Sequence, residues 1–574
     1  MRFFRNPAGL SLKAIPPQCV PLLFVLLYLL LNIVQASLTT LTSDEGYYWY
    51  LSTNLDWGYY DHPPLLPFLI SMGCRLFPGE LGVRIVNVVF VCIGLFFLLK
   101  LLGDEINRKF HPYLIILSLP LFNYLTFIVF PDTPLVALSA VFLYCYKRFL
   151  EKDDYASGVS MGLVLGLMLY AKYHAILLIL FVVLSNLSLL RNRKFMLTAG
   201  IALVMFVPHL WWQYTHDFVS LKYHLVGRSS GFRIDFLTEF LGVQPLVLGP
   251  ALIFVPFICK TKDAFERALK FIAIGTLSFF CVATLKGYVQ FHWTSIVVVP
   301  LVLLGCSYYA TRKKALLCWL SVPLLVFVLF LRVYLAWGII PVNTFNRVDY
   351  FHGREQWAQD IRGVAGGNPV VFESQLREAP LYSFYSGMQG IALYPGGNKK
   401  SEYEIRGAED GIQGRDVTLV KYGRNRHCTR LVTRMGKEIN YVSIRHFVSY
   451  LDIRINLKAI HKLPAQDAAG VRLEIVNHRD TPLTFARDSY GEPVRLLCVL
   501  HREDAGKDST VLSQELSARD SIGAHATRTI EAVIPLEKPD RGRCTVSFGF
   551  DDGEFAPSVN SERYEVPLTG NGPG

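Results

Sequence analysis

The feature that most constrains this 574-residue chain is a long series of apolar runs. The first, residues 20–38, reads VPLLFVLLYLLLNIVQASL and is about the length that spans a bilayer. Others follow near 82–103, 113–130, 134–146, 156–170, 175–190, 195–212, 241–259, 269–285, 294–310 and 315–337. Together with a hydrophobic content of 52%, they predict a polytopic α-helical membrane protein with about eleven or more transmembrane helices.

Two of these stretches are too long to be single helices. Residues 113–146 are interrupted only by Pro131-Asp132-Thr133-Pro134, and as one helix they would be roughly 50 Å long against a hydrocarbon core of about 30 Å. We therefore predict a helical hairpin with Asp132 at its tip. By the same reasoning, residues 156–190 fold back at Ala171-Lys172-Tyr173-His174.

The basic residues indicate the orientation, because cytoplasmic loops carry an excess of Lys and Arg. With the N-terminus in the cytoplasm, every basic cluster between spans falls on the cytoplasmic side, at 108–109, 147–152, 191–194, 260–262 and 312–314. The net charge of +11 therefore needs no nucleic-acid partner. The opposite side receives residues 39–81, the two hairpin tips, the loop 213–240, the turn 286–293 and the tail from about 338.

Residues 20–38 have a second interpretation, a cleaved signal peptide, since small residues end the run. We favour an uncleaved first helix because the stretch with the most candidate catalytic side chains follows it directly. That stretch is residues 43–64, SDEGYYWYLSTNLDWGYYDHPP, where carboxylates lie among aromatic rings.

Two interpretations of residues 43–64 remain open. In the first, the stretch is an interfacial helix that anchors the protein, because Tyr and Trp side chains suit the lipid–water boundary. In the second, more specific interpretation, Asp44 or Glu45 is a general base and the aromatic rings form a platform for a sugar. A carboxylate that aromatic side chains partly desolvate gains basicity, which proton abstraction requires.

The same side of the membrane gathers cations and imidazoles, namely Lys172, Arg228, Lys286, His62, His174 and His292. Opposite charge and several donors are what a lipid-linked phosphate needs when it becomes a leaving group. Taken singly, each residue has a plainer explanation: Lys172 and Arg228 could snorkel to the interface or bind headgroups, and a lone histidine is more often structural. Their joint occurrence favours a phosphate site.

Beyond a transmembrane domain at 1–340, the tail divides into two parts. Residues 341–460 mix helical and strand patterns, from REQWAQDIRGVA to DVTLVKYG, and predict a periplasmic α/β domain. Residues 461–574 hold short alternating strands such as VRLEIVN and RCTVSFGF, which predict a β-sandwich of immunoglobulin type. Whether it is a spacer or recognises substrate stays open, as does a disulfide between Cys498 and Cys544.

The motifs of the first 340 residues are Asp44-Glu45, GYYDHPPL at 58–65, PDTPL at 131–135, AKYH at 171–174, YHLVGR at 223–228 and HWT at 292–294. In kind and order they resemble the bacterial dolichyl-phosphate-mannose–protein mannosyltransferase-like family. This family includes the lipid A aminoarabinose transferases and lies within the GT-C class of membrane glycosyltransferases. The motif at 58–65 is fairly specific, and the set is stronger than any single member. The resemblance does not extend to the β-rich part from 461.

The resemblance implies an inverting glycosyltransferase of a bacterial inner membrane that takes its sugar from a polyprenyl phosphate such as undecaprenyl phosphate. It implies that Asp44 activates the acceptor hydroxyl with Glu45 assisting. His62, Lys172, Arg228 and Lys286 are the expected contacts of the donor phosphate, and Tyr59, Tyr60, Asp61, Asp132, His174, His292 and Trp293 the expected sugar and acceptor pocket. His62 stands where aminoarabinose transferases carry a lysine, which speaks against that activity in the strict sense.

The expected partners are the sugar donor, a periplasmic lipid, glycan or protein acceptor, and the bilayer. Some relatives bind a divalent cation near the acidic loop, and the sequence leaves a metal open, with Asp44, Glu45 or Asp132 as its ligands. The main rival is a non-enzymatic glycolipid transporter or flippase. Transporters usually place ionisable residues at mid-membrane, whereas here nearly all of them lie at one edge of the membrane, with Arg332 the conspicuous exception. The third interpretation is a structural scaffold protein, which would leave Asp44 and Glu45 without a function.

Overall fold

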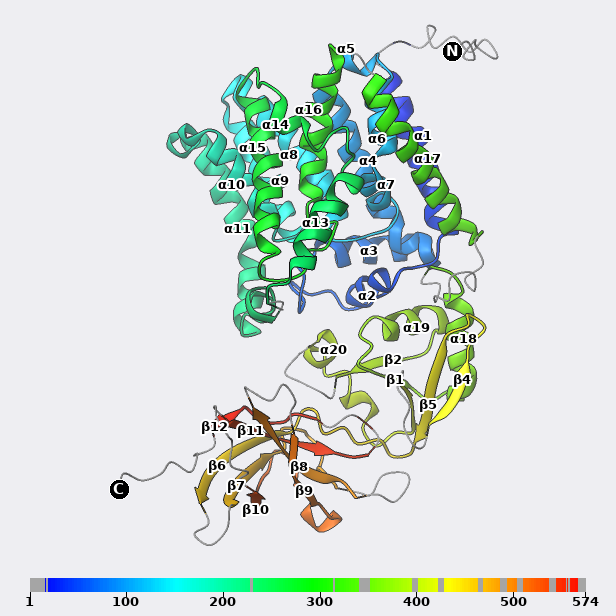
Figure 1. Ribbon diagram of the computed structural model, residues 1–574, viewed down its shortest axis with the longest axis vertical. Coiled ribbons are helices and arrows are strands. Elements are labelled where there is room, and N and C mark those ends of the chain that lie inside the picture. The colour runs from blue at the N-terminus through cyan, green and yellow to red at the C-terminus, as the bar shows by residue number, and fades with distance from the viewer. Residues whose placement is uncertain are drawn as a thin grey trace. The chain divides into compact units, whose positions relative to one another are not determined.

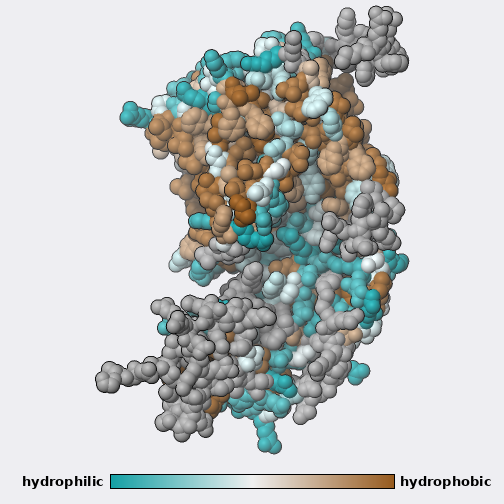
Figure 2. Space-filling model, viewed as in Figure 1, coloured by the Kyte–Doolittle hydropathy of each residue, from teal (hydrophilic) through white to brown (hydrophobic). Residues whose placement is uncertain are grey.

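A computed structural model describes residue 16 and residues 19–227, 231–312, 315–339, 351–394, 401–421, 428–462, 468–485, 493–502, 509–535, 544–553, 555 and 558–565. The chain divides into two compact units, Met1–Arg354 and Glu355–Gly574. We call the first the helical unit and the second the soluble unit. Figure 2 shows that apolar side chains cover most of the visible face of the helical unit.

The helical unit consists of long helices joined by short helical turns (Figure 1). Its elements are α1 (Val20–Leu38), α2 (Ser43–Ser52), α3 (Leu65–Leu76), α4 (Gly79–Leu102), α5 (Asp104–Asn107), α6 (His111–Ser118), α7 (Pro120–Leu125), α8 (Asp132–Lys152), α9 (Tyr155–Ala171), α10 (Ala175–Ser185), η2 (Leu187–Arg191), α11 (Arg193–Thr215), α12 (Val219–Lys222), η3 (Tyr223–Gly227), α13 (Ile234–Val247), α14 (Val255–Ile258), α15 (Ala264–Ala283), η4 (Ser295–Val297), α16 (Val298–Ala310) and α17 (Ala315–Trp337). The short α2 and α3 lie across the end of the bundle that is opposite α5 (Figure 1).

The chain is a membrane protein, but the count of eleven spans is not confirmed. Within the described residues, four helices are long and apolar enough to cross a membrane, namely α1, α4, α11 and α17. Several other apolar runs are broken into shorter helices. The run 113–130 is split between α6 and α7 at Pro120, which has no N–H to continue the first helix, and the run 241–259 is interrupted at Gly249, whose φ is +81°.

Both hairpin tips are where the spacing predicts them. α8 begins at Asp132, and α9 ends at Ala171 while α10 begins at Ala175. α3 and α4 approach closely because two glycines face each other: a Cβ on Gly73 would stand 2.1 Å from the Gly82 carbonyl oxygen. This contact keeps the α2–α3 layer against the end of α4.

The soluble unit begins with a mixed sheet flanked by α18 (Arg354–Ala365), α19 (Glu378–Ser386) and α20 (Glu402–Ile405). Its strands are β1 (Val370–Glu373), β2 (Gly390–Leu393), β3 (Val417–Lys421), β4 (Thr429–Val432) and β5 (Glu438–Ile444), in the order β2-β1-β3-β5-β4. β1 pairs in parallel with β2 and β3, whereas β5 is antiparallel to β3 and β4. The buried rings of Trp357, Phe372 and Tyr382 form its core.

Two antiparallel sheets follow, and they share one apolar core. The strands are β6 (Arg454–Lys462), β7 (Ala468–Val476), β8 (Arg495–Arg502), β9 (Ser509–Glu515), β10 (Thr527–Pro535), β11 (Cys544–Asp551) and β12 (Tyr564–Glu565). Their orders, β10-β7-β6 and β12-β11-β8-β9, are those of an immunoglobulin-like sandwich in which β9 pairs with β8. β6 begins at Arg454, a few residues before the expected boundary at 461.

The strand register excludes a disulfide between Cys498 and Cys544. In the β8–β11 pair, Cys544 lies opposite Arg502, whereas Cys498 lies opposite Phe548. The two cysteines are therefore four positions apart along the strands, roughly 13 Å, which exceeds the ~7 Å limit for Cα atoms that a disulfide joins. Cys498 is a free, buried thiol.

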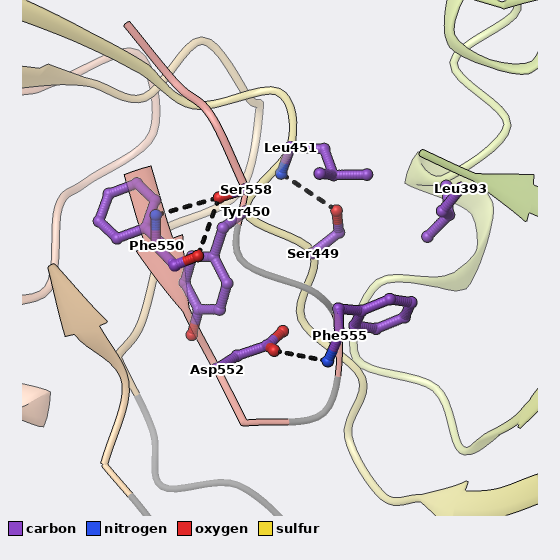
Figure 3. Close-up of a pocket in the computed structure, with 8 residues that line it drawn as sticks. All are labelled: Leu393, Ser449, Tyr450, Leu451, Phe550, Asp552, Phe555 and Ser558. Carbon is purple, nitrogen blue, oxygen red and sulfur yellow. Dashed lines mark hydrogen bonds between the residues drawn. The ribbon is translucent and has the colours of Figure 1, made fainter. Parts of the chain in front are cut away.

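A small open pocket lies between the mixed sheet and the sandwich (Figure 3). The end of β2 supplies Leu393, and the chain around the end of β11 supplies most of the other wall. Asp552 accepts a hydrogen bond from the Phe555 N–H at 2.9 Å, which holds that turn. The lining residues are Leu393, Ser449, Tyr450, Leu451, Phe550, Asp552, Phe555 and Ser558.

Candidate active site

The acidic loop begins with a capping box at the N-terminus of α2. The Thr42 side chain accepts a hydrogen bond from the Glu45 N–H at 3.2 Å, and the Glu45 carboxylate accepts one from the Thr42 N–H at 2.9 Å. This reciprocal pair satisfies two backbone donors that a helix N-terminus otherwise leaves open. Because the box fixes where α2 begins, it also fixes Asp44 in the first turn of the helix.

Glu45 is fully buried in a bidentate ion pair. Arg84, in the second turn of α4, donates from Nε to Oε1 and from Nη2 to Oε2, each at 2.7 Å, and both side chains have 0% exposure. The Val129 N–H adds a hydrogen bond to Oε1 at 3.1 Å. With both oxygens engaged in this way, Glu45 is better suited to hold the loop than to assist a proton transfer.

Asp44, by contrast, is only partly buried. Tyr48, one helical turn further along α2 on the same face, places its ring 5.5 Å from the His62 ring and 6.2 Å from the Phe130 ring, between centroids. Phe130 in turn lies 4.9 Å from the His292 ring. A continuous set of rings thus connects the Asp44 face of α2 to His292.

The Asp132 carboxylate is the centre of a second buried cluster. Its Oδ2 lies 2.6 Å from Lys172 Nζ and 2.7 Å from His292 Nδ1, and its Oδ1 accepts a hydrogen bond from Ser295 Oγ at 2.6 Å. Asp132 has no exposed surface and the Lys172 side chain is 9% exposed. The two hairpin tips and the 292–295 turn therefore converge, although they lie far apart in the sequence.

Aromatic groups surround the Lys172 ammonium. It lies 6.0 Å from the centre of the Trp293 ring, within the range of a cation–π contact. His174 packs edge-on against the same ring at 5.5 Å. Burial and the nearby Lys172 charge hold the pKa of His174 well below its usual value. His174 is therefore a neutral imidazole beside the Lys172–Asp132 ion pair.

His62 lies beside Asp61 in the turn before α3. Its Nε2 is 3.5 Å from Asp61 Oδ2, and Tyr47 donates a hydrogen bond to Asp61 Oδ1 at 2.8 Å. Burial lowers the pKa of His62 to about 4, although the Asp61 carboxylate opposes the shift. His62 is therefore a neutral imidazole at physiological pH, able to donate one hydrogen bond but not to supply a charge.

The remaining predicted residues differ in their surroundings. Tyr59 is fully buried, and its hydroxyl donates a hydrogen bond to the Asn54 carbonyl at 3.2 Å. It therefore supports the loop from inside and does not line the expected sugar and acceptor pocket. Tyr60 is partly buried and its ring contacts that of Tyr223 at 5.0 Å. Lys286 is exposed in the turn after α15. Arg228 lies outside the described residues.

The carboxylates do not fit a metal site. Arg84 and two backbone N–H groups occupy Glu45, while Lys172, His292 and Ser295 occupy Asp132. In the described part of the chain, no group of three or more His, Cys, Asp and Glu side chains is placed to hold a metal ion.

Several residues of the two clusters were not predicted from the sequence. Arg84 lies in the first part of an apolar run, and a charged residue that interrupts such a run signals a buried partner. Ser295 follows the HWT motif directly but has no distinguishing pattern. Phe130 precedes the PDTPL motif and reads as an ordinary apolar residue.

Known proteins resemble parts of this chain. The Dolichyl-phosphate-mannose-protein mannosyltransferase family matches residues 61–212. The lipid A galacturonosyltransferase RgtD of Rhizobium johnstonii is 25% identical over 248 residues, which are 41% of this chain and 52% of that protein. The chain thus spans about half the length of this curated relative.

Two solved structures share the fold. ArnT from Cupriavidus metallidurans in the apo state superposes with a TM-score of 0.54 and 15% identity, over 73% of this chain and 97% of that one. The same protein bound to undecaprenyl phosphate gives a TM-score of 0.51 and 14% identity over the same shares. The family match covers His62, Arg84, Asp132 and Lys172, whereas Asp44 and Glu45 precede the matched residues.

Proposed function

We propose that this chain, which resembles the GT-C membrane glycosyltransferases, moves a sugar from a polyprenyl-phosphate donor to an acceptor on the periplasmic side of the inner membrane. The observation that carries the proposal is the buried Lys172–Asp132–His292 cluster and the rings of Phe130 and Tyr48 that connect it to the Asp44 face of α2. The Asp132 cluster supplies the Lys172 cation for a phosphate. The acidic loop supplies the Asp44 carboxylate for a hydroxyl.

In the proposed step, Asp44 takes the proton from the acceptor hydroxyl as its oxygen attacks the anomeric carbon. The bond between that carbon and the phosphate oxygen breaks, and its electron pair leaves with the polyprenyl phosphate. Attack and departure on opposite faces of the sugar invert the anomeric configuration. The Lys172 ammonium stabilises the charge on the departing phosphate, and neutral His62 adds a hydrogen bond.

Two features of the cluster support this assignment of roles. Asp132 holds the Lys172 ammonium at 2.6 Å, so the cation is oriented before the donor arrives and need not be ordered by it. Undecaprenyl phosphate, which ArnT from Cupriavidus metallidurans binds, is the donor carrier that we propose for this chain.

We propose different roles for three residues than the sequence alone indicates. Glu45 holds the acidic loop through Arg84 and does not take part in proton transfer. Lys286, exposed in its turn, and Arg228 contribute to donor binding only if the donor's lipid phosphate extends beyond the Lys172 cluster. The α/β and immunoglobulin-like parts of the soluble unit are proposed as separate domains, at 341–460 and 461–574, with no role in the chemical step.

The transporter alternative depends on an ionisable residue within the bundle, and Arg332 is that residue. Its guanidinium donates to the side-chain oxygens of Asn32 at 2.9 Å and Asn123 at 3.2 Å, and it lies over the Phe127 ring at 4.9 Å. These neutral acceptors come from α1 and α7, so Arg332 joins three helices of the bundle. This contact pattern favours a structural role over a place on a transport path.

The test compares wild-type protein with Asp44→Asn at matched levels in membranes. Radiolabelled sugar is supplied on an extracted polyprenyl-phosphate donor pool, and both transfer and donor binding are measured. Asp104→Asn, an exposed carboxylate of α5, is the matched control. We expect Asp44→Asn to bind donor but to lose transfer by at least about 100-fold, while the control transfers normally. Transfer that survives in Asp44→Asn refutes the base, and no transfer in wild type favours the transporter.

A further inference from the structure

The strongest unassigned feature of the helical unit is the burial of Arg84. A guanidinium has five N–H donors, and in this chain each of them has an acceptor. Two of the donors bind Glu45, at 2.7 Å each. Nη1 donates to the Ala36 carbonyl at 2.9 Å and to the Thr39 carbonyl, and Nη2 also donates to the Thr40 carbonyl at 2.9 Å.

These carbonyls are at the C-terminal end of α1, where a helix leaves its last carbonyl groups without intrahelical partners and carries partial negative charge. Glu45 is at the N-terminal end of α2. Arg84 therefore joins the end of one helix to the start of the next, and it does so from a third helix, α4. Arg84 thus adds to the Thr42–Glu45 capping box in holding the turn that carries Asp44.

The charge of this arrangement is balanced without an added ion. Glu45 and Arg84 are both at 0% exposure, and a buried carboxylate next to a second carboxylate is costly unless a cation is paired with it. In an acidic loop, a divalent ion is one solution. Here the guanidinium already occupies both oxygens of Glu45, and its planar geometry matches them.

We propose that Arg84 is the positioning residue of the acidic loop and serves there as a resident cation in place of a divalent metal. The inference rests on the proposed function in one respect, that Asp44 acts as the base. By neutralising Glu45 and fixing the first turn of α2, Arg84 sets the position from which Asp44 acts. Transfer is then independent of divalent metal ions.

The first experiment measures transfer by the full-length protein with wild type, Arg84→Ala, Arg84→Lys and the exposed control Arg75→Ala. We expect Arg84→Ala to lower kcat by at least about 100-fold while the KM for donor changes less than about threefold, because donor contacts are elsewhere. Arg84→Lys keeps the charge but loses the two-pronged pairing, and its kcat falls about tenfold. Methylguanidinium restores part of the Arg84→Ala activity, whereas Mg²⁺ and Mn²⁺ do not.

Two outcomes overturn the proposal: wild-type activity that EDTA abolishes and Mn²⁺ restores, or Arg84→Lys with wild-type kcat. If Arg84→Ala fails to fold, the Arg84→Lys comparison decides alone.

A second readout needs no activity and therefore separates this inference from the proposed function. The thermal unfolding midpoint of the purified wild-type protein is measured with EDTA and with Mn²⁺. We expect the same midpoint in both. A midpoint that Mn²⁺ raises in wild type but not in Glu45→Gln would place a metal at Glu45 and refute the role of Arg84, whether or not transfer is detected.

Discussion

Replacing Lys172 by Met isolates the contribution of one ammonium to the Asp132 cluster. The substitution keeps the length and apolar stem of the side chain but leaves the fully buried Asp132 carboxylate with two partners, His292 at 2.7 Å and Ser295 at 2.6 Å. Asp132→Asn makes the reverse change, because it leaves the Lys172 ammonium in place without its carboxylate.

The magnitude follows from the burial of the pair. Removing one partner of a buried ion pair costs about 3–5 kcal/mol because the other charge is left uncompensated. The two surviving hydrogen bonds of Asp132 place Lys172→Met at the lower end, about 3 kcal/mol, and we expect a similar value for Asp132→Asn. The double variant carries neither charge, and we expect it to lose about 3 kcal/mol of stability as well, not the sum of the two single losses. The difference corresponds to a coupling energy of about 3 kcal/mol between Lys172 and Asp132.

The assay is thermal unfolding of the detergent-solubilised protein. At roughly 2 °C per kcal/mol for a unit of this size, each single variant should melt about 6 °C lower than wild type, and the double variant no lower than either. Lys222→Met is the control: its ion pair with Asp217 is exposed, so the midpoint should move by less than about 2 °C. Single-variant losses that add in the double variant would show that Lys172 and Asp132 do not interact as described.

Three further predictions concern other parts of the chain. Gly94→Leu should destabilise the helical unit by at least about 2 kcal/mol, because a Cβ there would stand 2.5 Å from the Ala137 Cα where α4 crosses α8; a thermal melt measures it, and an unchanged midpoint contradicts that packing. The folded pKa of His62, about 4, lies below its unfolded value of 6.5, so the stability linked to this group is complete above pH 6.5 and is lost as the pH falls toward 4. His62→Gln should therefore flatten that part of the stability–pH curve, and an identical curve would mean that His62 is not buried as a neutral imidazole. Cys498→Ser and Cys544→Ser should each leave the non-reducing gel mobility and the response to a reductant unchanged, whereas a shift in either variant would reveal a disulfide that the strand register does not permit.

Much of the layout was predictable because it depends on neighbours in sequence. The two hairpin tips were predicted from the length of apolar runs against the thickness of a bilayer, and α8 and α10 begin where that argument places them. The sandwich was predicted from the period of two in its strands. The division of apolar runs was less predictable, because Pro120 and Gly249 end helices inside stretches that composition alone reads as continuous.

The sequence by itself determined that this is a membrane protein, which residues could do chemistry, and where the chain turns, since these depend on hydrophobicity and on spacing within one or two turns of helix. Only the tertiary structure decided which of those residues contact one another. Glu45 and Arg84 are 39 positions apart, and Asp132 meets Lys172 and His292 from 40 and 160 positions away. Such pairings arise when packed helices bring buried charges together at a few ångströms, where desolvation makes an unpaired charge too costly. No local pattern in the sequence contains that information.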